Sequence, residues 1–149
     1  MPTRFFEDYH PGDVYELGAR EVGEAEILAF GRAYDPQYFH TDPDAAKRSI
    51  WGGLVASGWH TTAIFMRLLV DAHMKDSDSI GSPGVDEIRW LKPVRPGDRL
   101  SGRLTVLEAT PSKSGAARGM IRTRGELANQ HGEVVLSLKA MNLIGTRRA

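Results

Sequence analysis

The sequence contains no cysteine, which excludes disulfide bonds, thiolate nucleophiles and cysteine-ligated zinc. It also lacks an excess of charge of either sign, because 19 lysine and arginine residues balance 19 aspartate and glutamate residues. Proteins that bind nucleic acid generally depend on a basic excess that contacts the phosphates. The charge balance therefore gives no support for nucleic acid as the main partner.

Long hydrophobic runs are missing as well. The longest apolar stretch, at residues 64–70, is interrupted by Arg67 and is far too short to span a bilayer. Residues 1–8 contain no apolar core of the length found in signal peptides. From these features we expect a soluble, cytoplasmic protein that does not insert into a membrane.

What is present is the composition of an ordinary globular domain, with 41% hydrophobic and 26% charged residues in a chain of 149. We therefore expect one domain over residues 1–149. Helix signals dominate the first half of the chain and strand signals the second. One strand, then an apolar helix, then a series of antiparallel strands is an α+β pattern.

In the first half we predict an extended run at residues 14–22. Three helices should follow, at residues 24–33, at residues 42–48, and from residue 54 or 58 to residue 73. The first helix should end before Pro36, because a residue that precedes proline is pushed out of the helical region. Asp42 is a suitable cap for the second helix. The long helix is apolar on nearly all sides, which predicts that other structure surrounds it.

In the second half we predict a loop at residues 76–84 and then four strands, at residues 85–91, 99–108, 117–128 and 133–144. Leu100, Gly102 and Leu104 alternate with Ser101 and Arg103. This period of two is what a sheet with one covered face requires. The economical arrangement is a sheet curled around the long helix, although periodicity alone leaves other arrangements open.

The pattern that carries chemistry lies between residues 30 and 61. Four residues separate Asp35 from His40, a second aspartate stands at position 42, and Gly58 stands where the long helix can begin. A Pro-Val-Arg-Pro-Gly-Asp turn at residues 93–98 separates two predicted strands. Together these segments resemble the MaoC-like dehydratase family, which includes the (R)-specific enoyl-CoA hydratases. The resemblance covers about residues 5–144.

The resemblance implies a single hotdog domain, in which an antiparallel sheet wraps around a long central helix. It also implies that Asp35 and His40 form the catalytic pair and that the backbone N–H of Gly58 holds the thioester oxygen of the substrate. Substrate contacts are then expected from the neighbouring residues Ser57, Trp59, Phe39 and Tyr38. No metal or redox cofactor is implied, and coenzyme A is expected only as part of the substrate. The implied assembly is a homodimer with its sheets side by side, or a dimer of such dimers.

These residue types suit the addition of water to an enoyl thioester. Water must lose a proton as it attacks the β carbon, the α carbon must gain one, and the thioester oxygen must be stabilised as it gains enolate character. A carboxylate and an imidazole on one short loop can hold the water and relay both protons. The unpaired N–H groups at a helix N-terminus favour developing negative charge, and such a donor typically contributes about 3–4 kcal/mol.

The sequence departs from the best-studied hydratases at two places. Gln37-Tyr38 stands where they have Asn-Pro in the loop between the aspartate and the histidine. They also orient the aspartate with a serine two turns into the helix, and Met66 stands at that position here. Thr61 and Thr62 are the candidate replacements. These departures concern the identity of the substrate more than the type of reaction.

The same residues also have plainer interpretations. Asp35 could be a helix-end carboxylate bonded to local backbone, Asp42 is expected to cap a helix, and His60 is expected on the helix surface or in a dimer contact. A zinc site from His40, Asp42 and His60 matches no standard ligand spacing and is not expected. Trp90 is expected to pack in the core. Contacts to CoA phosphates are left open among Lys92, Arg95 and Arg118.

Three functions fit these observations. The first is a hydro-lyase that adds water reversibly to an enoyl-CoA. The second is an acyl-CoA thioesterase on the same fold, in which a carboxylate directs water at the thioester carbonyl. The third is a non-catalytic acyl-CoA binding module, against which the presence of both Asp35 and His40 argues.

Overall fold

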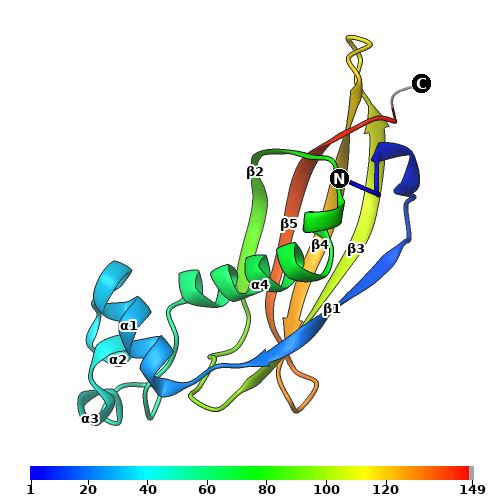
Figure 1. The fold of residues 1–149 in the computed structure, drawn as a ribbon. Coiled ribbons are helices and arrows are strands. Elements are labelled where there is room, and N and C mark those ends of the chain that lie inside the picture. The colour runs from blue at the N-terminus through cyan, green and yellow to red at the C-terminus, as the bar shows by residue number, and fades with distance from the viewer. Residues whose placement is uncertain (148–149) are drawn as a thin grey trace.

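The computed structural model describes residues 1–147 and contains one antiparallel sheet that curves around a long helix (Figure 1). Within these residues the helices are α1 (Glu24–Tyr34), α2 (Tyr38–Thr41), α3 (Pro43–Ala46) and α4 (Gly58–Ala72), and short 3-10 turns cover Phe6–Asp8 and Met74–Asp76. The strands are β1 (Val14–Glu21), β2 (Ser79–Trp90), β3 (Arg99–Pro111), β4 (Arg118–Ala128) and β5 (Val134–Gly145), in the order β1-β3-β4-β5-β2. The predicted α+β architecture is confirmed.

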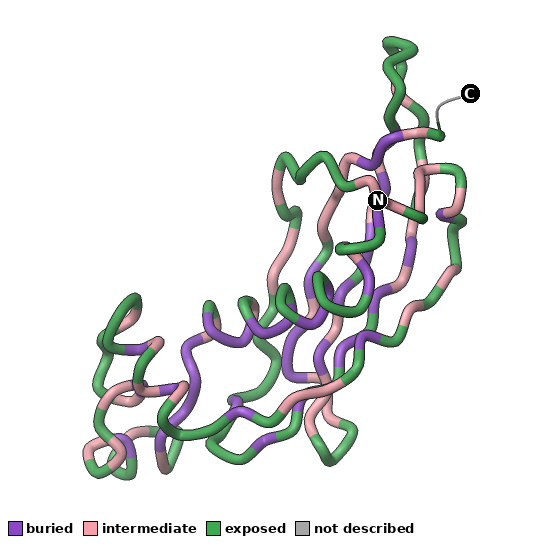
Figure 2. Tube along the Cα trace, viewed as in Figure 1, coloured by how far each residue is buried: buried purple, intermediate pink, exposed green. Residues whose placement is uncertain are grey.

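The core lies between α4 and the concave face of the sheet. Ile64, Phe65 and Leu68 of the helix are buried against apolar side chains from β3, β4 and β5. Figure 2 shows buried segments along α4 and along the sheet. Burying each side chain of this size contributes roughly 1.5–3 kcal/mol. The ring of Phe65 lies over Gly125 of β4, where any side chain would collide with it. This close approach fixes α4 against the middle of the sheet.

The sheet covers only one side of α4, which corrects the expectation that the helix is surrounded. Met66 is 53% exposed, and Val70 and Trp59 are exposed as well. The sheet has a single layer and the helix lies on its concave side, so the outward apolar side of α4 is left uncovered (Figure 1). No helix within residues 1–147 is long and apolar enough to cross a membrane.

β2 begins at Ser79, so the prediction of a loop at residues 76–84 is wrong from that residue onward. Gly81, Pro83 and Gly84 suggested a loop, but they lie on an edge strand whose pairing with β5 shifts register at the two glycines. Proline is tolerated on an edge strand and glycine permits bulges. The other four strands lie within three residues of their predicted bounds.

The three short helices gather beyond the N-terminal end of α4 and carry the motif residues (Figure 1). α1 ends before Asp35, whose φ of −149° and ψ of 71° lie outside the helical region that a following proline disfavours. α2 was not predicted, because a single turn of four residues is too short to show helical periodicity. The carboxylate of Asp42 accepts hydrogen bonds from the backbone N–H groups of Asp44 and Ala45, which confirms it as a helix cap.

Candidate active site

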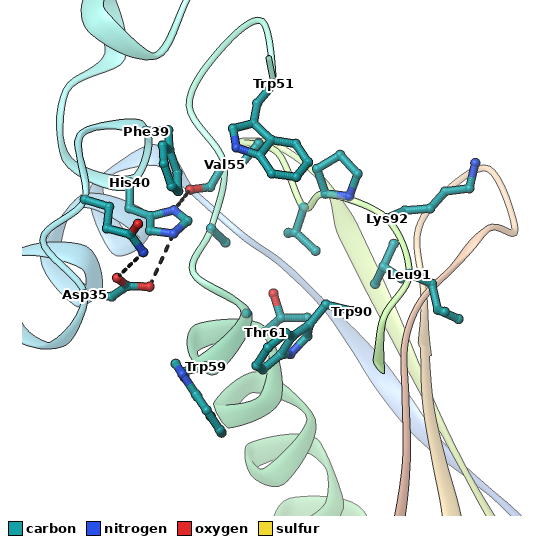
Figure 3. A pocket seen from close by; sticks show the side chains of 16 residues that line it. Asp35, Phe39, His40, Trp51, Val55, Trp59, Thr61, Trp90, Leu91 and Lys92 are labelled. Carbon is teal, nitrogen blue, oxygen red and sulfur yellow. Dashed lines mark hydrogen bonds and ion pairs between the residues drawn. The ribbon is translucent and has the colours of Figure 1, made fainter. Parts of the chain in front are cut away.

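The structure brings Asp35 and His40 together. Asp35 is the C-terminal cap of α1 and His40 is the third residue of α2. His40 Nε2 lies 3.3 Å from Asp35 Oδ2 (Figure 3). Gly31 of α1 permits this approach, because a Cβ atom there would lie 2.6 Å from the backbone oxygen of His40. A glycine one turn before Asp35 therefore sets the position of the histidine.

The tautomer of His40 follows from its second contact. His40 Nδ1 lies 2.6 Å from the carbonyl oxygen of Val55, in the extended segment before α4. A carbonyl oxygen only accepts hydrogen bonds, so Nδ1 carries the hydrogen and donates it. In the neutral ring Nε2 is then unprotonated and faces the carboxylate. Two acceptors at this distance need a proton between them, and either a protonated Nε2 or a bridging water supplies it.

Asp35 accepts two further hydrogen bonds. The hydroxyl of Ser57 donates to Oδ2 at 2.7 Å, and the side-chain amide of Gln37 donates to Oδ1 at 2.9 Å. Burial raises the pKa of Asp35, but the hydrogen bonds from Gln37 and Ser57 and the charge of His40 outweigh this effect and hold the pKa below its ordinary value. Asp35 therefore stays ionised near neutral pH and can accept a proton.

The hydroxyl that orients Asp35 comes from Ser57, for which the sequence predicted only a substrate contact. Ser57 is also the N-terminal cap of α4, where its oxygen accepts the backbone N–H of Trp59 at 3.3 Å. Thr61 and Thr62 donate instead to the carbonyl oxygens of residues 57 and 58, so neither reaches the aspartate. A serine directly before a helix that begins with glycine is a capping signal that could have identified Ser57 in the sequence.

Gly58 opens α4, and its backbone N–H has no hydrogen-bond partner among residues 1–147. The N-terminal end of the helix makes this N–H a suitable donor to a developing oxyanion. The absence of a side chain has a specific cause, because a Cβ atom here would lie 2.5 Å from the indole ring of Trp90. On that side Gly58 makes room for a protein side chain.

These groups line a cavity of about 480 Å³ (Figure 3). Asp35 and His40 lie on one side of it, Trp51 lies on another, and Trp59 and Trp90 lie at the α4 end. The remaining lining residues are mainly apolar: Gln37, Phe39, Val55, Ala56, Gly58, Thr61, Leu91, Lys92, Pro93, Val94 and Val135. An apolar cavity with a few converging polar groups is the usual form of a small-molecule site.

Not every predicted residue takes part. Tyr38 is exposed and does not line the cavity, whereas Phe39 and Trp59 do. Trp90 was expected in the core, but it is 45% exposed and forms part of the cavity wall, because β2 is an edge strand with no neighbour on its outer side. His60 was expected on the helix surface or in a dimer contact, but it is buried within the single chain.

His60 and Asp42 serve contacts away from His40. His60 Nε2 lies 3.2 Å from a carboxylate oxygen of Glu26, and its ring stacks on Phe30. Asp42 caps α3. The three residues considered as zinc ligands therefore make separate contacts.

The basic residues considered for CoA phosphates are also separated. Lys92 lines the cavity and pairs with Glu133 at 2.9 Å. Arg95 donates to the carbonyl oxygen of Trp51 at 2.6 Å, and Arg118 does not line the cavity. Lys92 is therefore the only one of the three that lines the cavity.

Comparisons with known proteins identify the family. Residues 8–126 match the family model described as MaoC like domain. The MaoC-like dehydratase from Rhodospirillum rubrum is 41% identical, with a TM-score of 0.87 over 97% of this chain and 99% of that chain. The mesaconyl-CoA hydratase of Cereibacter sphaeroides is 32% identical over 142 residues, which cover 90% of this chain and 39% of the relative.

A more distant likeness supports the fold alone. The (R)-hydratase of A. caviae involved in PHA biosynthesis is 20% identical, with a TM-score of 0.71 over 95% of this chain and 99% of that chain. The shared arrangement is the hotdog fold that the sequence motifs implied. Because the family model matches residues 8–126, which is most of the chain, this chain belongs to the MaoC-like dehydratase family.

Proposed function

We propose that the protein catalyses the reversible addition of water to a 2-enoyl thioester of coenzyme A, with Asp35 and His40 as the acid–base pair. The observation that supports this most strongly is the 3.3 Å approach of His40 Nε2 to Asp35 Oδ2 at the wall of an apolar cavity. The unpaired N–H of Gly58 borders the same cavity, as an oxyanion donor must. At the level of the family, the activity is that of a hydratase or dehydratase.

The reaction needs a water held between Asp35 Oδ2 and His40 Nε2. Its oxygen forms a bond to the β carbon while its proton passes to the pair, and the electron pair of the double bond moves toward the thioester. The enolate oxygen then accepts the hydrogen bond of the Gly58 N–H. The pair returns a proton to the α carbon, so that one water is added overall. Dehydration runs through the same steps in reverse.

Two features favour a CoA ester as the substrate. The mesaconyl-CoA hydratase relative is named for such an ester, and the cavity is mostly apolar with one exposed cation, Lys92, among its lining residues. Lys92 is the lining residue best suited to meet a phosphate or carboxylate of the substrate. No metal or redox group has a part in the proposed steps.

We also propose that the protein acts as a homodimer joined along β2. This strand is one edge of the sheet, where unpaired backbone groups can pair with another strand. Exposed apolar residues cluster on β2 and on the outer side of α4, namely Ile80, Val85, Met66 and Val70. Val85→Lys should shift the protein toward monomer in sedimentation velocity, whereas Ile50→Lys, at an exposed residue outside α4 and β2, should not. A wild-type monomer at every concentration would refute the proposed dimer.

The test of the reaction uses crotonyl-CoA and two simultaneous readouts, the loss of enoyl absorbance and the release of free thiol. Loss of absorbance without thiol release identifies a hydratase. Thiol release with the double bond intact identifies a thioesterase. Asp35→Asn and His40→Ala should each slow hydration by at least about a hundredfold, which is the usual loss for a positioned acid–base group.

The chain offers a matched control for these variants. His10 and Asp13 form a second histidine–aspartate pair at 3.5 Å, on the surface and outside the cavity. His10→Ala and Asp13→Asn make the same chemical changes there and should leave the hydration rate within about twofold of wild type. Near-normal rates in the Asp35 and His40 variants would overturn the proposal.

A further inference from the structure

A second apolar cavity lies beside the catalytic one. It has a volume of about 300 Å³ and lies between α4 and the sheet. Its lining is largely apolar and comes from α4, β2, β3, β4 and β5: Trp59, Thr62, Ala63, Phe65, Met66, Leu69, Ser82, Val85, Leu104, Thr123, Leu138, Ala140 and Asn142. Trp59 also lines the catalytic cavity, so the two spaces adjoin at this residue.

Trp59, the residue that the two cavities share, packs against a second indole ring, that of Trp90, on the catalytic side. Trp90 and Trp59 pack edge to face, with ring centroids 5.1 Å apart and an interplanar angle of 78°. Figure 3 shows both side chains at the α4 end of the catalytic cavity. Trp59 belongs to the lining of both cavities, whereas Trp90 belongs only to the catalytic one.

Trp90 is held firmly in this position. Its indole N–H donates to the hydroxyl of Thr62 at 3.1 Å, and that hydroxyl donates to the carbonyl oxygen of Gly58 at 2.9 Å. Its ring also fills the space that a side chain on Gly58 would occupy. The ring is therefore attached to the first turn of α4, next to the N–H proposed to hold the thioester oxygen.

We propose that Trp90 determines acyl-chain length, because its indole ring closes the catalytic cavity against the second apolar cavity and restricts the enzyme to short-chain enoyl thioesters. The inference rests on the proposed hydratase function. An acyl chain held by its thioester oxygen at Gly58 meets the Trp90–Trp59 wall within a few carbons. Beyond that wall Phe65, Met66 and Leu69 offer the apolar surface that a longer chain would need.

Removal of the Trp90 side chain should leave the ring of Trp59 without its packing partner and open a passage between the two cavities. Wild-type protein should hydrate crotonyl-CoA with a kcat/KM at least about tenfold above that for oct-2-enoyl-CoA, since even one methylene that does not fit a pocket costs on this scale. Trp90→Ala should raise the octenoyl-to-crotonyl ratio of kcat/KM by at least about tenfold. Thr62→Val keeps the ring but removes its hydrogen bond, so the ratio should rise by a smaller factor. This second variant keeps the test available if Trp90→Ala does not fold.

Trp51→Leu is the matched control, because the indole of Trp51 lines the catalytic cavity but packs against Phe39, whereas that of Trp90 packs against Trp59, the residue that both cavities share. It should change the rates for both esters in the same proportion. An unchanged octenoyl-to-crotonyl ratio in both Trp90→Ala and Thr62→Val would overturn the role of Trp90 and leave the hydratase proposal standing. A wild-type protein that prefers oct-2-enoyl-CoA to crotonyl-CoA would also overturn the role of Trp90 and leave the hydratase proposal standing.

If no ester is hydrated, the proposed function is overturned. The role of Trp90 is then tested by measuring binding. Calorimetric titration with butyryl-CoA and octanoyl-CoA needs no turnover. Trp90→Ala should bind octanoyl-CoA at least about tenfold more tightly than wild type does, if Trp90 restricts the length of the acyl chain. Equal affinities in the two proteins would overturn that role.

Discussion

Ser57→Ala removes one hydroxyl with two separate roles, and the two effects can be measured apart. The hydroxyl donates to Asp35 Oδ2 at 2.7 Å and accepts the backbone N–H of Trp59 at the start of α4. Loss of a serine cap costs about 1 kcal/mol of stability. Loss of a hydrogen bond to a charged group costs roughly 1.5–3 kcal/mol, which corresponds to a fall in kcat of about ten- to a hundredfold if the bond orients the carboxylate for reaction.

The pH profile separates the orienting role from the cap. The Ser57 hydrogen bond lowers the pKa of Asp35, so its removal should raise that pKa and move the acidic limb of the kcat profile to higher pH. The assay is hydration of crotonyl-CoA across the acidic range, with thermal unfolding measured in parallel. Ser57→Thr keeps a hydroxyl and should recover most of the rate. An unmoved acidic limb with a normal kcat in Ser57→Ala would refute the orienting role, even if the variant melts at a lower temperature.

Three further predictions concern other parts of the molecule. Gly58→Ala should lower hydration by at least about a hundredfold, because the new Cβ collides with the ring of Trp90 beside the oxyanion donor; an unchanged rate would contradict the geometry. Gly31→Ala should displace His40 and reduce kcat by about tenfold or more without abolishing folding, as steady-state kinetics and circular dichroism would reveal. Burial and the charge of Arg4 lower the pKa of His73 from 6.5 to about 4, so the folded state binds fewer protons than the unfolded state between these values. The free energy of unfolding should therefore fall as the pH drops through this window, by about 2.5 kcal/mol near pH 4.5, and urea denaturation of wild type and His73→Gln would isolate this contribution.

Local chemistry explains which parts of the fold the sequence could predict. Alternation along β3, the capping role of Asp42 and the break at Pro36 are properties of neighbouring residues, so they can be recognised without coordinates. β2 was mispredicted because an edge strand accepts the proline and glycines that elsewhere mark a loop. The exposure of Met66 depends on how far a single sheet reaches around α4, which no local pattern contains.

In the candidate site, too, local features were predictable and contacts between distant segments were not. The spacing of Asp35 and His40 made that pair a candidate, and the structure brings the two side chains together. Their supporting contacts join segments far apart in the chain, such as Ser57 to Asp35 and Trp90 to Gly58. Such contacts depend on how α1, α4 and β2 pack together. For this reason the sequence did not reveal the contact of Ser57 with Asp35, and it misassigned Trp90 to the core.

The most direct test of the account is a double-mutant cycle on the hydration of crotonyl-CoA with Asp35→Asn, His40→Ala and the variant that carries both. If the two side chains act on one water, neither retains its function alone. The double variant should then be no more than about threefold slower than the slower single variant. Losses that multiply in the double variant would mean that the two groups act independently, which contradicts the claim of a shared water.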